Sequence, residues 1–178
     1  MALVKPVVFQ VVGYQNSGKT TFSSKVVHQL KAHQFRTVTI KHHGHGGKPD
    51  TWMSKDTGKH LRSGAIAAIV EGDGRLLLQA EDYDCNLGDQ IELLTFFKPD
   101  VILIEGYKQE HYPKLLLVRE PTDIPLLGKL NNVIATICWS EEIKNLIPKK
   151  WTGPSFLITD ETSINWTIHF VKNQFNQN

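Results

Sequence analysis

The feature that most constrains this chain is Gly13–Thr20, which reads Gly-Tyr-Gln-Asn-Ser-Gly-Lys-Thr. It fits the phosphate-binding pattern G-x-x-x-x-G-K-[ST] at every fixed position. The apolar run before it, Val7–Val12, is rich in β-branched residues and predicts a strand buried on both faces of a parallel sheet. After it, apolar residues recur at helical spacing from Phe22 to Leu30. The motif therefore has the strand, loop and helix context of a nucleotide-binding site.

The spacing of the motif has a chemical reason. Its glycines let the loop curl without Cβ clashes, so that backbone N–H groups converge on phosphate oxygens at the positive end of a helix dipole. Lys19 is expected to reach the β- and γ-phosphates, and the Thr20 hydroxyl to contact Mg²⁺. The alternative is a chance Gly-rich turn, which a chain of this length would match at a level of about one per cent.

Composition narrows the class of protein. A chain of 178 residues fits one domain, a sheet covered by helices on both faces. The balance of 20 basic and 18 acidic residues gives no field that would favour nucleic acid or an anionic membrane as a partner. Cys85 and Cys138 form no C-x-x-C pair, so free thiols are favoured over a disulfide. With no leader-like segment and no membrane-spanning apolar run, we expect a soluble, cytoplasmic protein.

A long loop is predicted after the second strand, Thr37–Ile40. Glycines and a proline interrupt any periodicity between His42 and Trp52, at the sheet edge where ligands bind in open α/β folds. His42, His43 and His45 crowd this loop, and imidazole is a common ligand for Zn or Ni, so a metal site is one interpretation. No cysteine lies near to complete four ligands, and a role beside the phosphates or plain loop polarity is the favoured interpretation.

The segment 55–65 offers a further acidic residue. Asp56 could reach Mg²⁺ or an attacking water, and Lys59 or Arg62 could meet a phosphate. The alternative is that these residues lie on a short, capped, solvent-exposed helix with no role at the site. For Asp56 the two interpretations are equally favoured, and for Lys59 the exposed helix is favoured. Next, 67–70 and 76–80 predict a hairpin that would make the sheet mixed, followed by a helix from Leu87 to Thr95.

A second acidic residue, Glu105, ends the apolar run Val101–Ile104. Phosphate-loop proteins place their second magnesium-side carboxylate at such a strand end, usually an Asp. The longer Glu side chain still permits contact through a metal-bound water, or positioning of a catalytic water. The alternative is a chance acidic residue at the end of a core strand.

The rest of the chain completes an α/β fold. We predict a phosphate-loop NTPase domain over 1–178, with a mostly parallel sheet flanked by helices, a hairpin insertion at about 66–81 and a frayed tail at about 173–178. The further elements expected are strands at 115–118, 133–137 and 156–158, an irregular connection at 121–128, a short helix at 141–146 and a C-terminal helix from Ile164 to Phe175.

These motifs together resemble one family. The loop Gly13–Thr20, Ile40-Lys41-His42, the segment 55–65, Glu105-Gly106-Tyr107-Lys108 and Pro113-Lys114 occur in the order seen in molybdopterin-guanine dinucleotide biosynthesis protein B, MobB. The Glu-Gly-aromatic-Lys element and the Gly-Ala at 64–65 are the more specific signs. The resemblance extends to about residue 160.

The resemblance implies a GTP-binding adapter, usually a homodimer, that hydrolyses GTP weakly with Mg²⁺. It implies partnership with the guanylyltransferase MobA, which joins GMP to molybdenum-bound molybdopterin, itself a further candidate ligand. The catalytic residues that the resemblance implies are Lys19, Asp56 and Glu105. The residues that it implies at the Mg²⁺ site are Thr20, Glu105 and Asp56. The nucleotide-binding residues it implies are Gly13, Tyr14, Gln15, Asn16, Ser17, Gly18, Lys19, Thr20, Thr21, Lys41 and His42.

One departure leaves the base specificity open. GTPases often carry Asn-Lys-x-Asp after a late strand, whereas this chain has Cys138-Trp139-Ser140-Glu141 there. Guanine preference therefore follows from the resemblance alone. Two alternatives stay open: a small-molecule kinase, for which Lys59, Arg62 and Arg75 form no obvious lid, and a metal-delivery GTPase, which only the His-rich loop supports.

Overall fold

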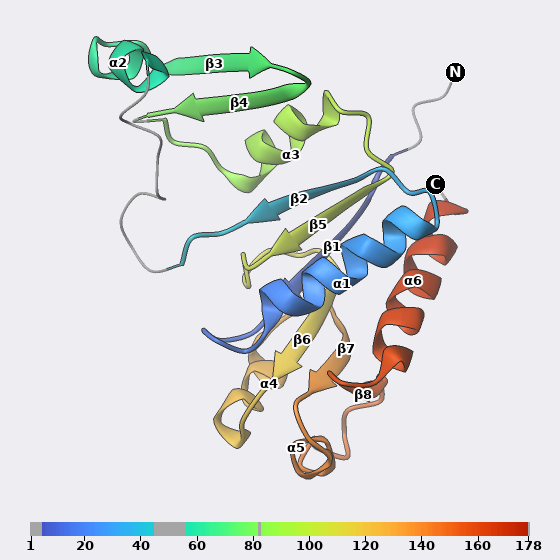
Figure 1. The fold of residues 1–178 in the computed structure, drawn as a ribbon. Coiled ribbons are helices and arrows are strands. Elements are labelled where there is room, and N and C mark those ends of the chain that lie inside the picture. Colours follow the sequence, from blue (N-terminus) through green and yellow to red (C-terminus); the bar gives the residue numbers. More distant parts are fainter. Residues whose placement is uncertain (1–4, 45–55, 82, 178) are drawn as a thin grey trace. The chain divides into compact units, whose positions relative to one another are not determined.

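The structure is a computed structural model that describes residues 5–44, 56–81 and 83–177. It divides into two compact units, residues 1–42 with 91–178, and residues 43–90, which are considered separately. The first unit holds a six-stranded, entirely parallel sheet in the order β2-β5-β1-β6-β7-β8 (Figure 1). Its strands are β1 (Val7–Val12), β2 (Thr37–Lys41), β5 (Val101–Glu105), β6 (Lys114–Val118), β7 (Val133–Cys138) and β8 (Ser155–Leu157).

The central strands are buried on both faces because they are apolar at nearly every position. All five residues of β5 and all five of β6 are buried, and β1 pairs with both of these strands. Such continuous apolar strands can only be stable when helices cover both sides of the sheet. Since every strand is parallel, the carboxyl ends of all six strands meet at one edge, which is where a ligand would bind.

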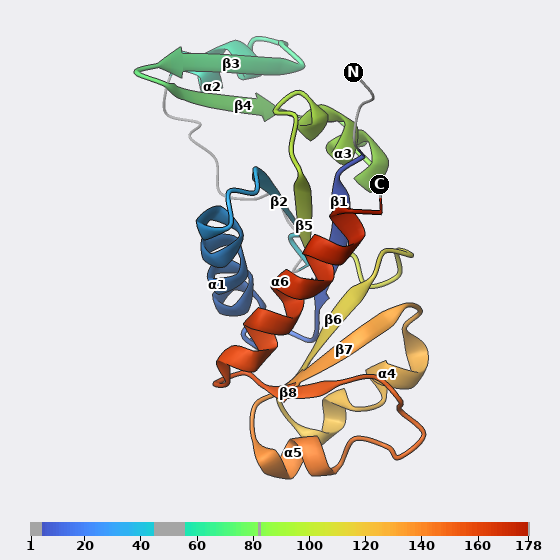
Figure 2. The ribbon, with the colours of Figure 1, turned by 90° about the vertical axis from the view of Figure 1, so that its right-hand side faces the viewer.

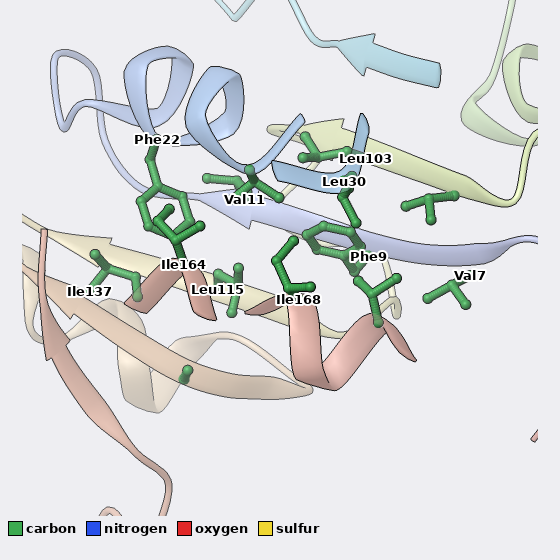
Figure 3. Packing of buried hydrophobic residues seen from close by; sticks show 14 of the residues in the cluster. Val7, Phe9, Val11, Phe22, Leu30, Leu103, Leu115, Ile137, Ile164 and Ile168 are labelled. Carbon is green, nitrogen blue, oxygen red and sulfur yellow. The ribbon is translucent and has the colours of Figure 1, made fainter. Parts of the chain in front are cut away.

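One face of this sheet is covered by α1 (Lys19–Ala32) and α6 (Glu161–Phe175), which lie side by side (Figures 1 and 2). Their apolar residues point into a common core with alternate residues of the strands (Figure 3). Phe22 and Leu30 from α1 and Ile168 from α6 meet Phe9 and Leu115 of the sheet there. Burying one such side chain contributes about 1.5–3 kcal/mol.

The other face has a smaller apolar cluster at the carboxyl ends of the strands. Val12, Leu116 and Val118 pack there with residues of α4 (Leu126–Lys129) and α5 (Glu141–Asn145). A 3-10 turn, η1 (Pro121–Asp123), precedes α4, so the connection expected to be irregular contains two short helical turns.

The second unit consists of α2 (Asp56–Arg62) beside the hairpin of β3 (Ala67–Gly72) and β4 (Arg75–Ala80), and α3 (Leu87–Thr95) spans the division between units. The prediction that the hairpin makes the sheet mixed is wrong. Among the strands that the structure describes, β3 and β4 pair only with each other, and they form a separate two-stranded sheet. Periodicity reveals a hairpin, but its pairing with other strands depends on contacts distant in sequence.

The C-terminal helix, α6, ends at Phe175, as the spacing of its apolar residues predicts. The Phe175 ring packs edge-to-face on Phe35, with their centroids 5.3 Å apart. The fraying expected for 173–178 stays a prediction. Nowhere in 5–44, 56–81 or 83–177 is there a helix whose length and hydrophobicity would suit a bilayer crossing.

Candidate functional site

The predicted phosphate loop joins β1 to α1 at the carboxyl edge of the sheet. Gly13 is required by space, because a Cβ atom there would lie 2.6 Å from Ser17 Oγ and 2.9 Å from the Leu117 carbonyl oxygen. Asn16 lies at φ 58°, a left-handed conformation that Asn tolerates better than most residues. The loop is thus held in a tight curve against β6, with its final residues opening α1.

The amino terminus of α1 suits an anion. Gly18 is its N-cap, no side chain caps the helix, and no acidic residue lies in its first turn. The first N–H groups of a helix have no partner within it and carry a partial positive charge. Lys19 Nζ donates a hydrogen bond of 2.6 Å to the Tyr14 carbonyl oxygen, which holds this ammonium group across the loop. A polyphosphate would therefore meet backbone N–H groups and an ammonium group together.

Glu105 from β5 and Thr20 from α1 meet beside the loop. The Thr20 hydroxyl donates to Glu105 Oε1 at 2.7 Å, and the Glu105 side chain is largely buried. Lys41, at the end of β2, donates to Thr20 Oγ1 at 3.2 Å and lies 3.6 Å from Glu105 Oε1. Strand order explains this grouping, since β5 lies between β1 and β2. The structure thus brings together three of the residues predicted for the site.

The Thr20 hydroxyl oxygen and the Glu105 carboxylate oxygen fit the requirements of Mg²⁺. Hydroxyl and carboxylate oxygens are the ligands this ion prefers, and neighbouring ligands at 2.0–2.1 Å in an octahedron stand about 3 Å apart. The Thr20–Glu105 spacing of 2.7 Å is close to that value. Lys41 is mostly exposed, so its ammonium group can move away when a metal–phosphate complex enters. Thr20 and Glu105 would hold the ion.

The local field at Lys19 is set by burial and by its neighbours. Burial lowers the pKa of Lys19 below its ordinary 10.5, Glu105 opposes this shift, and Lys108 and Lys41 add to it. Among the described residues that act on Lys19, the lysines are Lys41 and Lys108 and the carboxylates are Glu105 and Asp123. Lys19, Lys41 and Lys108 together give the loop a local positive charge that suits a triphosphate.

The segment after Glu105 is the part of the site that sequence reasoning described least. Gly106 and Tyr107 both have positive φ, 98° and 50°, and a Cβ atom on Gly106 would lie 2.9 Å from His42 Cβ. His42 also contacts the Tyr107 ring, with centroids 4.5 Å apart. Lys108 Nζ lies 4.9 Å from the centre of the Tyr14 ring, a cation–π contact with the phosphate loop. The Glu-Gly-aromatic-Lys element therefore joins His42 to the phosphate loop.

Gln10 holds this segment and was missed by the sequence analysis. It is fully buried in β1, and its Nε2 donates to the carbonyl oxygens of Gly106 and Tyr107 at 2.8 and 2.7 Å. The available signal was a single polar residue within an otherwise apolar run, which is costly to bury unless it is hydrogen-bonded. Gln10 thus fixes the backbone that follows Glu105.

Lys114 anchors the far end of the same loop. It is buried at the start of β6, where its Nζ donates to the carbonyl oxygens of Glu110 and, at 3.0 Å, Tyr112. Burial lowers the pKa of this ammonium group. The Pro113-Lys114 pair recognised in the sequence therefore has a structural role in shaping the loop that carries Tyr107 and Lys108.

The remaining candidates are Asp56 and the histidines that follow β2. Asp56 belongs to the second unit, where it is exposed and pairs with Lys59 at 2.8 Å in the first turn of α2. Its role at the metal or water stays a prediction. His45 lies outside the described residues. Within the ranges that the structure describes, no three His, Cys, Asp or Glu side chains group in a way that could hold a metal ion.

Comparison with known proteins assigns the family. Residues 8–139 match the family model of MobB, described as molybdopterin guanine dinucleotide synthesis protein B. The chain is 42% identical over 144 residues to a probable molybdopterin-guanine dinucleotide biosynthesis adapter protein of Bacillus subtilis, covering 80% of this chain and 82% of that protein. The fold and site are those of a phosphate-loop protein with a parallel sheet. Within that class, the chain belongs to the MobB family, as its motifs indicated.

Solved structures agree with this assignment. The crystal structure of Bacillus subtilis MobB is similar with a TM-score of 0.77 and 34% identity, covering 91% of this chain and 96% of that one. A MobB homologue from Bacillus stearothermophilus gives a TM-score of 0.73 at 34% identity, covering 93% and 98%. The predicted α/β class, parallel sheet and hairpin are confirmed.

Proposed function

We propose that this chain is a GTP-binding adapter protein of molybdopterin-guanine dinucleotide biosynthesis. The observation that carries the proposal is the Thr20–Glu105 pair, 2.7 Å apart, beside a full phosphate-loop motif in a member of the MobB family. Membership supports the pathway, and the name of the Bacillus subtilis relative supports the adapter role. Guanine preference is part of the proposal and is supported by the family alone.

In this proposal the phosphate loop binds the triphosphate and the chain supplies few groups for chemistry. Lys19 exchanges the Tyr14 carbonyl oxygen for the β- and γ-phosphates, and the N–H groups opening α1 bind phosphate oxygens. Thr20 and Glu105 would hold Mg²⁺, which would supply positive charge to the phosphates. Glu105 orients a water molecule, and Asp56 is the second candidate for that role. We expect slow hydrolysis.

The partner proposed for the nucleotide-bound form is the guanylyltransferase MobA, with molybdopterin as a further candidate ligand. An adapter acts through contacts with other proteins. Its phosphate-loop site would therefore hold GTP or supply it to the partner, rather than hydrolyse GTP and release the product rapidly. The loop 106–112 is suited to report occupancy, because it contacts the phosphate loop through Lys108 and is fixed at its ends by Gln10 and Lys114.

We also propose a homodimer, for which the hairpin gives the support. Ile69 and Leu78 pair across the strands on one face, and Val70 and Leu77 on the other, yet these four side chains are 43–61% exposed. An isolated two-stranded sheet is marginally stable in water, and apolar residues on both faces favour association. We propose that a second copy of this chain, which has the same two apolar faces, packs against the hairpin.

Calorimetric titration with GTP and separately with ATP, in the presence of Mg²⁺, tests the nucleotide proposal. Micromolar or tighter GTP binding with at least tenfold discrimination against ATP is the expected result. A preference for ATP would contradict the adapter-GTPase proposal and favour the kinase alternative. If GTP is preferred, capture of purified guanylyltransferase by immobilised protein, with and without GTP, tests the partner, and Lys19→Ala is the control for nucleotide dependence.

A further inference from the structure

Two side chains border the phosphate loop on the side away from Glu105. Arg119 directly follows β6, and Trp139 directly follows β7. The Trp139 indole Nε1 donates to the Ser17 carbonyl oxygen at 2.9 Å, and an Arg119 guanidinium N–H donates to the Asn16 carbonyl oxygen at 3.1 Å. The guanidinium carbon also lies 5.1 Å from the centre of the Trp139 ring. Both side chains are thus fixed to the loop and to each other.

The order of the strands gives these residues a place relative to the nucleotide. β1, which leads into the phosphate loop, lies between β5, which carries Glu105, and β6, and β7 follows β6 in the sheet. The metal-bound end of a triphosphate must lie near Thr20 and Glu105, because the magnesium-side oxygens are there. A nucleoside triphosphate has its phosphates at one end and its nucleoside at the other. The nucleoside must therefore extend from a different side of the loop than the one that faces Glu105. Trp139 and Arg119 occupy that side.

The chemistry of the pair matches a nucleoside base. Trp139 keeps 42% of its surface exposed although its indole N–H is hydrogen-bonded, so an apolar aromatic surface faces solvent beside the loop. A Cβ atom on Gly18 would lie 3.3 Å from Trp139 Cζ2, which shows how closely the ring approaches the end of the loop. Aromatic side chains bind bases by stacking, and any base can stack in this way because each has a π-face.

We propose that Trp139 and Arg119 form the nucleoside-binding side of the phosphate-loop site, with the purine stacked on the part of the indole that Arg119 leaves open. This inference rests on the proposed binding of a nucleoside triphosphate. Stacking contributes affinity for both purines, so Trp139 strengthens GTP and ATP binding alike, and selection between them requires other groups. The Cys138-Trp139-Ser140-Glu141 sequence that lacks a base-recognition motif thus supplies the stacking surface instead.

Calorimetry with two ligands separates base contacts from phosphate contacts. Trp139→Ala is expected to weaken GTP binding about ten- to a hundredfold, while binding of inorganic triphosphate with Mg²⁺ changes less than twofold. Trp139→Phe keeps a ring but loses the hydrogen bond to Ser17, and it should retain most of the GTP affinity. Trp166→Phe, which changes a tryptophan in α6 that packs on Phe170, is the matched control and should bind both ligands normally.

Other outcomes would overturn the inference. Equal losses of GTP and triphosphate affinity in Trp139→Ala would mean that the indole only maintains loop shape, and unchanged GTP affinity would mean that it does not meet the base. If the wild-type protein binds inorganic triphosphate as tightly as GTP, the nucleoside adds no affinity. The inference then fails, whereas the proposal that the phosphate loop binds phosphates is kept. If the wild type binds neither ligand, the proposed function fails first and the inference with it.

A second measurement leaves Trp139 intact, in case its substitution prevents folding. A variant with Trp52, Trp151 and Trp166 each replaced by Phe retains Trp139 as its single tryptophan. GTP is expected to quench or shift its fluorescence at saturation, whereas inorganic triphosphate should have less than a quarter of that effect. Equal responses to the two ligands would contradict stacking on Trp139.

Discussion

The parallel sheet and the hairpin are built from similar residues but differ in what covers them. Phe9 and Leu115 in the sheet are fully buried, whereas Ile69 and Leu78 in the hairpin are 61% and 43% exposed. β1 reads VVFQVV and β4 reads RLLLQA, so strand composition alone does not separate the two cases. The difference lies in the neighbours. α1 and α6 cover one face of the parallel sheet, whereas the hairpin strands pair only with each other among the described strands. A buried apolar strand contributes to the stability of the fold. An exposed apolar strand indicates a surface that associates with another protein chain.

The largest expected effect is on stability and applies to the sheet alone. Phe9→Ala should lower the free energy of unfolding by about 3–5 kcal/mol, because it leaves a cavity between α1, α6 and the sheet. Leu77→Ala in the hairpin should change it by less than about 1 kcal/mol when measured at a concentration where the protein is monomeric. Urea unfolding followed by circular dichroism measures both. Similar losses in the two variants would contradict the contrast between the units.

The next effect is on nucleotide binding. Lys19→Ala should weaken triphosphate binding about a hundred- to a thousandfold, because an ammonium group at the phosphates is lost from a partly desolvated site. Its free energy of unfolding should change little, since burial already disfavours the charged Lys19 in the fold. Calorimetry and urea unfolding of the same preparation give both numbers. Unchanged affinity would mean that this loop is not the binding site.

The hairpin prediction concerns assembly. The double variant Ile69→Lys, Leu78→Lys places two like charges opposite each other on one exposed face and should weaken self-association at least about tenfold. Sedimentation velocity over a range of concentrations measures the dimer fraction. Calorimetry on the same variant should show GTP affinity within twofold of wild type. A control, Glu71→Lys, changes charge in β3 without removing an apolar side chain. A dimer unaffected by the double variant would assign the interface to another surface.

The smallest expected effect is the alkaline loss of stability at Cys138. Burial raises the pKa of this thiol from 9.0 to about 11, so the folded protein keeps it neutral while the unfolded chain ionises it. The stabilising effect is therefore present below pH 9 and is lost as the pH rises from 9 to about 11. At pH 10 the loss should be about 1 kcal/mol relative to Cys138→Ala, measured by urea unfolding at pH 8 and 10. Parallel pH dependence in both proteins would contradict the assignment.

Local patterns were sufficient to predict most elements of this chain. The strand before Gly13, the helix after it and the acidic end of β5 are each encoded in a few adjacent residues, so periodicity and motif spacing identify them. The expected mixed sheet was wrong because pairing between strands depends on residues far apart in sequence. The contact between Phe175 and Phe35 likewise joins residues far apart in sequence, so no local pattern encodes it.

The sequence by itself determined the phosphate loop, its lysine, the Thr20 hydroxyl and the family, because fixed spacing along one segment carries that chemistry. Only the tertiary structure decided that Glu105 lies 2.7 Å from Thr20, that buried Gln10 holds Gly106 and Tyr107, and that Trp139 and Arg119 border the loop from the opposite side. The physical reason is the parallel sheet. Its strand order brings the carboxyl ends of distant strands to one edge, and no local pattern encodes which strand ends become neighbours.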